Sequence, residues 1–149
     1  MLNVYKRVLE DLIPLAEDKH IDLGVEGLQD AKVWANELDI IAIVKNLVDN
    51  AIRYTPDGGR VDLSVSTERG RAVLRIQDSG PGIQVEERAR VFEPFYRTLG
   101  SDQVGSGLGL SIVKAITDRM GAEIQMGFAD ELKHSGLRVC VFIPLIEAL

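Results

Sequence analysis

The sequence predicts an α+β fold in which helices pack against a largely antiparallel sheet. Two neighbouring stretches alternate apolar and polar residues across a short polar connection, as in a β-hairpin, whereas other stretches show helical periodicity. The 149 residues contain no internal repeat and no low-complexity linker, so we expect one domain spanning residues 1–149. With 46% hydrophobic and 27% charged residues, the composition is that of a globular protein.

The N-terminal part is expected to form one helix and two short strands. Apolar residues at helical spacing predict the helix over residues 3–19, where Pro14 could introduce a kink. The strands are expected at Ile21–Val25 and Ala31–Ala35.

A long helix and a hairpin follow. Asn36 is a favourable N-cap for a helix from about Glu37 to Tyr54, and the turn residues Thr55–Gly59 end it. The alternating stretches Arg60–Thr67 and Ala72–Gln77 then form the hairpin, with one face buried.

A glycine-rich stretch separates the hairpin from the last elements, because six of the 14 glycines fall between residues 80 and 109. Within it, Glu86–Phe92 can form a short helix, and Thr98–Ser106 has too few large apolar residues to pack, so we expect it to be mobile. Three further elements complete the prediction: a helix at Leu108–Met120 ended by Gly121, and strands at Glu123–Phe128 and Leu137–Ile143.

The charge distribution narrows the classes of ligand. The net charge of −6 argues against a chain that mainly binds nucleic acid or anionic lipid, but a small polyphosphate needs only a local group of donors. Residues 9–30 carry the whole deficit, whereas residues 88–114 carry a local surplus of two positive charges. An anionic ligand is therefore compatible with the acidic composition.

Cysteine and histidine usage excludes several other classes. The lone Cys140 lies in the apolar run Val139–Ile143, which predicts a buried strand position, and one cysteine forms neither a disulfide framework nor a zinc site. We expect His20 and His134 to be surface residues. Apolar runs of at most five residues and a charged N-terminal stretch predict neither a membrane span nor a signal peptide. The chain suits a reducing compartment.

Polar side chains lie beside the apolar face of the long predicted helix. Asn46, Asn50 and Tyr54 follow one another at intervals of four residues, with Arg53 alongside. A solvated helix edge would explain each of them singly. Together, two amide oxygens could bind a hard cation, the guanidinium could neutralise phosphate, and the aromatic ring could cover a flat heterocycle.

Two glycine motifs accompany this helix. The motif Asp78–Ile83 follows a predicted strand. Its carboxylate could accept a hydrogen bond from an exocyclic amino group, and its glycines would let the main chain approach a ring closely. A plain turn between a strand and a helix would use the same residue types. The motif Gly105–Leu110 opens a helix, whose free N–H groups could bind an anion. It matches neither a Walker loop nor a Rossmann fingerprint.

In their order and spacing, these motifs resemble the N, first glycine, F and second glycine boxes of bacterial sensor histidine kinases. The four matching segments are Asn46–Pro56, Asp78–Gly82, Phe92–Arg97 and Gly105–Gly109. The resemblance covers nearly the whole chain. It implies the Bergerat fold shared with gyrase, heat-shock chaperone and mismatch-repair ATPases, a two-layer sandwich of a mixed, mostly antiparallel sheet backed by about three helices.

The resemblance also implies a role for each matching position, with ATP and Mg²⁺ as cofactors. Asn50 would coordinate Mg²⁺ with help from Asn46, Arg53 would contact phosphate, and Arg97 would reach the γ-phosphate. Asp78 would bind the adenine amino group. The other expected nucleotide-binding residues are Tyr54, Gly80, Gly82, Ile83, Gly105, Ser106, Gly107, Leu108, Gly109 and Leu110; Phe92 and Phe95 would anchor the base of the lid or serve as ordinary core aromatics.

The implied activity is transfer of the γ-phosphoryl group of ATP to a histidine on a separate dimerisation and phosphoacceptor domain, with a response regulator further downstream. The resemblance implies an acceptor histidine on a dimerising helical hairpin, with an acidic neighbour as base. Neither His20 nor His134 has that setting, so the chain is expected to be the catalytic module of a longer, membrane-anchored kinase. We expect it to be cytoplasmic, monomeric when isolated, and without contact to membrane or nucleic acid. By the same resemblance, Asn46 corresponds to the site of a glutamate that activates water in the related ATPases. An amide cannot act as a base at neutral pH, so hydrolysis should be slow.

Two other classes of function remain open at this stage. One is a regulatory module that senses ATP or ADP, or holds a partner, without transferring phosphate. The other is a hydrolytic ATPase or serine-directed kinase of the same superfamily. Label from ATP on a histidine, on a serine, or on neither would separate the three.

Overall fold

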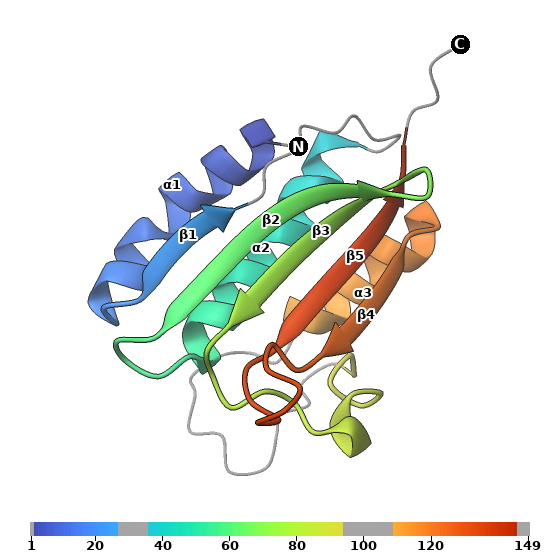
Figure 1. Cartoon of the computed structure of the whole chain (residues 1–149). Helices are drawn as coiled ribbons and strands as arrows, with labels where there is room; N and C mark the ends of the chain where they lie inside the picture. Colours follow the sequence, from blue (N-terminus) through green and yellow to red (C-terminus); the bar gives the residue numbers. More distant parts are fainter. Residues whose placement is uncertain (1, 27–35, 94–108, 146–149) are drawn as a thin grey trace.

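The structure is a computed structural model that describes residues 2–26, 36–93 and 109–145. Within these ranges, three α-helices cover one face of a five-stranded sheet, which gives two layers (Figure 1). The elements are α1 (Leu2–Asp18), β1 (Asp22–Glu26), α2 (Glu37–Tyr54), β2 (Arg60–Glu68), β3 (Arg71–Asp78), the 3₁₀ turn η1 (Val85–Glu87), α3 (Gly109–Met120), β4 (Glu123–Gly127) and β5 (Arg138–Pro144).

The sheet has the strand order β1-β2-β3-β5-β4. Strand β1 pairs with β2 in parallel, and the other three pairs are antiparallel. The predicted α+β class with a mostly antiparallel sheet is therefore confirmed. The C-terminal end of β3 and the start of β5, two inner strands, lie side by side, with Gln77 opposite Arg138.

The core lies between the sheet and the helices. Alternate side chains of β2 point inward and are fully buried, as the period of a half-buried strand requires. Helix α2 supplies the opposing apolar face, and Tyr5 of α1 is buried with its hydroxyl donating to the Ser64 carbonyl at 2.8 Å. The fully buried side chains in this layer include Val61, Leu63, Val65, Ile43, Val44, Val48 and Ile52.

The bounds of α2 agree with the prediction at both ends because local chemistry fixes them. The Asn36 side chain accepts from the Leu38 N–H at 2.8 Å, which caps the helix N-terminus. At the other end Thr55 leaves the helical region, at φ −86° and ψ 129°, as expected for a residue that precedes a proline.

Most other element predictions agree to within one or two residues, and α1 continues through Pro14. The predicted helix at Glu86–Phe92 is wrong: only η1 forms, followed by turns. No residue of η1 is buried, so the start of the segment has no apolar stripe that packs on the core and stabilises an α-helix. The predicted strand Ala31–Ala35 and the predicted lid Thr98–Ser106 lie outside the described residues.

The face of the sheet opposite the helices carries its own small apolar cluster. Cys140 is buried in β5, as predicted, and packs with Val73 and Phe142. The Arg71 guanidinium covers the Phe142 ring at 4.6 Å from its centroid and pairs with Glu123 at 3.0 Å. Long polar side chains thus shield this face from water without a further layer of helices.

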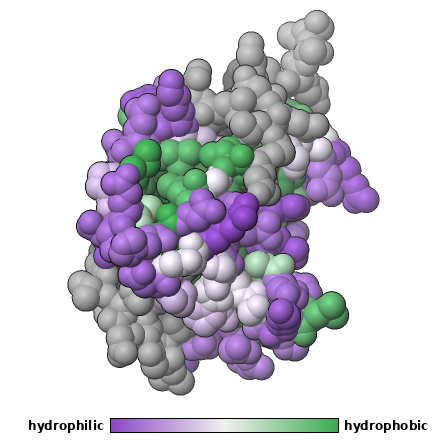
Figure 2. Space-filling view, turned by 60° about the vertical axis from the view of Figure 1, so that its left-hand side comes forward, coloured by the Kyte–Doolittle hydropathy of each residue, from purple (hydrophilic) through white to green (hydrophobic). Residues whose placement is uncertain are grey.

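The described surface is mostly hydrophilic. In the space-filling view of Figure 2, hydrophobic residues gather in one area in the upper half of the face and in one isolated spot at the right-hand side of its lower half. His20 and His134 are exposed, as predicted. Among the described helices, none is long and apolar enough to cross a bilayer.

Candidate nucleotide site

Asp78 is the last residue of β3, and its carboxylate is held by main-chain donors from two segments. Its Oδ1 accepts from the Gly80 N–H at 2.9 Å and from the Leu137 N–H at 3.1 Å. The residue is 6% exposed. No hydrogen bond to Oδ2 is found within the described part of the chain, so this oxygen can accept from a ligand amino group.

Burial raises the pKa of Asp78 to about 6 from its ordinary value of 3.8, although the N–H groups of Gly80 and Leu137 favour the ionised form and limit the rise. At neutral pH the side chain is therefore mostly a carboxylate. An ionised, acceptor-only group suits the recognition of an exocyclic amino group.

The segment after Asp78 is packed so closely that only glycine fits at two positions. Gly80 is buried, and a Cβ there would lie 2.9 Å from the Tyr54 carbonyl oxygen at the end of α2. Gly82 has φ +80°, and a Cβ there would lie 2.6 Å from the Gly136 oxygen. The first glycine motif therefore joins α2 to the β4–β5 connection, and Ile83 is buried behind it.

The β4–β5 connection is a part of the site that sequence reasoning missed. The Gly136 N–H donates to the Gly80 carbonyl at 2.7 Å, and the Asp78 N–H donates to the Leu137 carbonyl at 2.9 Å. Gly136 adopts φ +71°, and a Cβ there would lie 2.4 Å from the Asp78 carbonyl oxygen. A single glycine directly before the last predicted strand was the signal available in the sequence.

Phe128, just after β4, braces the same segment. The His134 ring stacks on the Phe128 ring with centroids 5.1 Å apart, and the Arg88 guanidinium lies 4.8 Å from the Phe128 centroid. The Arg88 Nε also donates to the Ile83 carbonyl at 3.1 Å. These contacts tie η1 and the first glycine motif to the end of β4.

On α2, the structure brings the first amide against the start of α3. The Asn46 Nδ2 donates to the Ala42 carbonyl at 2.7 Å, which leaves Oδ1 directed away from that bond. A Cβ on Gly109 would lie 3.5 Å from this oxygen. The N box and the start of α3 are therefore neighbours, and Leu110, the second residue of α3, is buried.

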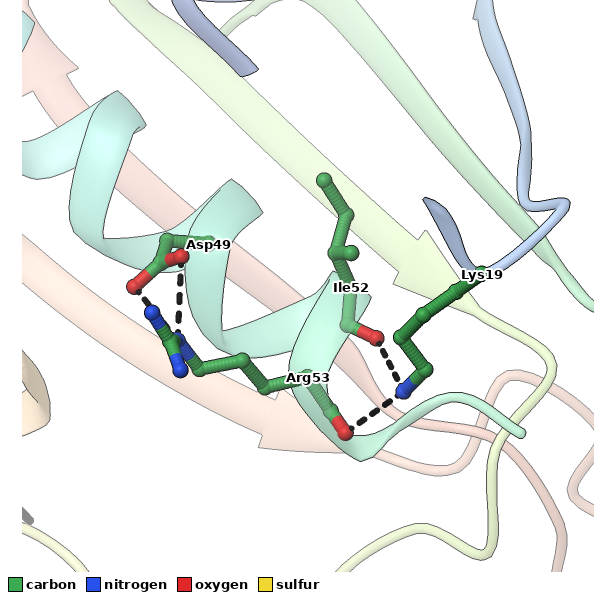
Figure 3. Close-up of polar contacts among 4 residues, drawn as sticks. All are labelled: Lys19, Asp49, Ile52 and Arg53. Atoms are coloured by element: carbon green, nitrogen blue, oxygen red, sulfur yellow. Dashed lines mark hydrogen bonds and ion pairs between the residues drawn. The ribbon is translucent and has the colours of Figure 1, made fainter. Parts of the chain in front are cut away.

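Arg53 of α2 is held by an acidic residue of the same helix. The Arg53 Nε donates to both carboxylate oxygens of Asp49 at 3.1 Å, one turn earlier (Figure 3). Asn50 and Tyr54 are half-buried on the same helix. Thr55 is fully buried, and its Oγ1 donates to the Ala51 carbonyl at 2.7 Å.

The remaining predicted site residues lie outside the described part of the chain. They are Arg97, Gly105, Ser106, Gly107 and Leu108, together with Phe95 of the F box. Phe92 is partly buried against the core.

The donors that are present suit a metal ion carried by a nucleotide. Within the described ranges, no three His, Cys, Asp or Glu side chains converge as an independent metal site. The amide oxygens of Asn46 and Asn50 are hard donors, and Mg²⁺ commonly takes a few protein oxygens, with phosphate and water completing its shell.

Comparison with known proteins identifies the class of the fold and site. The family described as histidine kinase-, DNA gyrase B-, and HSP90-like ATPases matches residues 35–147. The sensor protein kinase PmrB of Pseudomonas aeruginosa is 43% identical over 138 residues, which cover 92% of this chain. The swarming motility regulation sensor protein RssA of Serratia marcescens is 35% identical over 133 residues, which cover 89% of it. The chain spans 28% of the length of each.

Solved structures show the same fold. The mycobacterial sensor histidine kinase MprB superimposes with a TM-score of 0.87 at 32% identity, covering 99% of this chain and 97% of that one. Full-length ShkA in complex with AMPPNP superimposes with a TM-score of 0.83 at 29% identity, covering 98% of this chain and 30% of that one.

The chain belongs to the family of histidine kinase-, DNA gyrase B- and HSP90-like ATPases. Within it, the chain is an ATP-binding catalytic domain of the sensor histidine kinase type, as its relatives and structural neighbours show.

Asp78→Asn tests the energetic cost of the buried carboxylate. The folded-state pKa of about 6 lies above the ordinary value of 3.8, so between these pH values the folded protein holds a proton on Asp78 that the unfolded chain releases. The stabilisation by this proton is therefore complete below pH 3.8 and is lost as the pH rises through 6. Relative to the variant, the wild type should lose about 2 kcal/mol of unfolding free energy between pH 4.5 and pH 8. Urea denaturation of both proteins from pH 4.5 to 8 measures the difference, and a pH-independent difference would contradict the assignment.

Gly82→Ala tests the close packing behind the first glycine motif. Both Gly82 and Gly58 have positive φ, but a Cβ on Gly58 meets nothing within 4 Å. Gly58→Ala should therefore cost about 1 kcal/mol for backbone strain alone, whereas Gly82→Ala should cost at least about 1 kcal/mol more. Urea denaturation compares the two variants, and equal losses would show that the predicted clash with Gly136 is relieved without cost.

Proposed function

We propose that residues 1–149 act as one domain that binds Mg·ATP and delivers the γ-phosphoryl group to a histidine of a separate dimerisation and phosphoacceptor domain. The observation that carries the proposal is the Asp78 carboxylate, buried at the end of β3, with Oδ1 held by two N–H groups. A buried carboxylate of this kind costs folding free energy, and recognition of an amino group accounts for that cost.

The comparisons support the nucleotide and the larger assembly. The solved structure of ShkA, which shares this fold, contains the ATP analogue AMPPNP. The relatives PmrB and RssA are named as sensor proteins, and more than two thirds of each lies outside the matched part. We therefore place the acceptor histidine on a further domain of the parent protein and a response regulator downstream.

The residues of the chain would act mainly by positioning and charge neutralisation. Asp78 Oδ2 accepts from the adenine amino group, while Gly80 and Gly82 keep the main chain close to the ring. Asn50, assisted by Asn46, would hold Mg²⁺, which when bound neutralises phosphate charge. Arg53 and Arg97 would neutralise the phosphates further.

Asn46 sets the preference for transfer over hydrolysis. Its Nδ2 donates to the Ala42 carbonyl at 2.7 Å, so the amide presents a neutral oxygen. An amide does not remove a proton from water at neutral pH. Hydrolysis of bound ATP should therefore be slow compared with transfer to a docked histidine.

The same proposal covers location and assembly. A domain that uses ATP works where ATP is available, so we place it in the cytoplasm as part of a membrane-anchored sensor kinase. The chain alone is proposed to be a monomer, with no contact to membrane or nucleic acid.

The test of this function is phosphotransfer in trans. The chain is mixed with γ-labelled ATP, Mg²⁺ and the proposed dimerisation and phosphoacceptor domain of the parent protein. Acid-labile label on the histidine of that domain is the expected result, and it should disappear when the chain carries Asp78→Ala. Acid-stable label on serine, no label, or rapid phosphate release without transfer would each contradict the proposal.

Asn50→Ala tests the proposed metal ligand. Removing the amide oxygen should reduce the enhancement of ATP affinity by Mg²⁺ by about tenfold, because amide oxygens are ligands of this hard cation. Asn50→Asp, which keeps an oxygen at the same place, should retain the enhancement. Calorimetry with and without Mg²⁺ measures it, and an Asn50→Ala variant with the full enhancement would refute the role.

A further inference from the structure

The C-terminal end of α2 needs donors that the chain cannot supply locally. The last four carbonyls of a helix have no partner within it. The Ala51 carbonyl accepts from the N–H and the Oγ1 of Thr55. The Ile52 carbonyl would next pair with residue 56, but Pro56 has no N–H. The end of the helix that carries Asn50, Arg53 and Tyr54 therefore depends on a donor from elsewhere.

Lys19, just beyond the end of α1, supplies that donor. Its Nζ donates to the carbonyls of Ile52 and Arg53, both at 2.9 Å (Figure 3). An ammonium group at a helix C-terminus also offsets the partial negative charge of the helix end. Burial lowers the pKa of Lys19 from its ordinary value, with Asp57 opposing the change and Arg53 adding to it.

The main chain around Lys19 is fixed to the connection that leads to the site. The Gly58 N–H donates to the Lys19 carbonyl at 2.9 Å, and the Asp22 N–H donates to the Gly59 carbonyl at 2.9 Å. A Cβ on Gly59 would lie 2.8 Å from Ser79 Oγ, the neighbour of Asp78. An uninterrupted series of contacts therefore runs from Lys19 to the first glycine motif.

The same end of α2 touches the first glycine motif directly. A Cβ on Gly80 would lie 2.9 Å from the Tyr54 carbonyl oxygen and 3.4 Å from Thr55 Cα. The last turn of α2 therefore sets where Tyr54 lies relative to Asp78. A shift of this turn would move one wall of the site with respect to the other.

We propose that Lys19 is a positioning residue for nucleotide binding, which fixes the last turn of α2 against the Asp78–Gly80 segment from outside the site. The inference rests on the proposed ATP-binding function. Lys19 contacts α2 through its carbonyl oxygens and acts on the nucleotide through the position of that turn.

The chain offers a matched control on the same two helices. Arg7 of α1 pairs with Glu37 of α2 at 3.0 Å, at the N-terminal end of α2. This cation also joins α1 to α2, but at the end of α2 opposite to Asn50, Arg53 and Tyr54. Arg7→Met therefore removes a connection from a cationic side chain of α1 to α2, here an exposed ion pair, without touching the last turn.

The experiment compares Lys19→Met, Lys19→Arg and Arg7→Met in the full chain. ATP affinity is measured by calorimetry at a temperature where circular dichroism shows every variant folded. Lys19→Met should weaken binding about tenfold, Lys19→Arg should recover most of it, and Arg7→Met should stay within about twofold of wild type. Hydrogen exchange at the amides of Gly58 and Gly59 should accelerate in Lys19→Met alone.

The outcomes separate this inference from the function on which it rests. Normal wild-type binding together with an unchanged ATP affinity in Lys19→Met would overturn the positioning role alone. An equal loss of affinity in Lys19→Met and Arg7→Met would also overturn it, because it would indicate a general effect of loosening α1. A wild-type chain that binds no ATP would overturn the proposed function, and the positioning role with it.

Discussion

The fixing of one carboxylate by main-chain donors is the constraint on which the site depends. Asp78 Oδ1 accepts from the N–H of Gly80, two residues ahead, and from that of Leu137, directly before β5. To provide the second donor, the β4–β5 connection must lie against the end of β3, where Gly136 approaches too closely for any side chain. The glycines at positions 80, 82 and 136 follow from this one arrangement, because each allows two backbone segments to meet beside the carboxylate.

In this arrangement, the requirements of stability and of ligand binding conflict. Burial makes the ionised form of Asp78 costly, as its pKa of about 6 indicates, and the two N–H groups offset only part of that cost. A protonated or amide side chain would suit the fold better at neutral pH. An ionised carboxylate with one unengaged oxygen suits an amino group of a ligand, so the residue is best explained by binding.

Local signals made much of the fold predictable. Asn36 and Pro56 mark the ends of α2, and the alternation in β2 and β3 marks the hairpin, because capping and side-chain period depend on neighbours in sequence. The motif that contains Asp78 could be recognised for the same reason. The roles of Gly136 and Lys19 could not, since their partners lie 56 and 33 or more residues away and depend on the folded topology. The predicted helix after Ile83 does not form because η1 buries no residue against the core.

The order of the strands bears on how the protein folds. The hydrogen bond between Asp78 and Leu137 joins residues 59 apart in sequence, and it requires β5 to pair with β3. The β2–β3 hairpin, by contrast, needs only a short loop closure and can form early. Contacts between distant segments form late and slowly because the chain must lose more entropy to make them. The site is thus expected to be among the last parts of the domain to assemble, so a chain released before β5 is complete would hold the hairpin without its binding pocket.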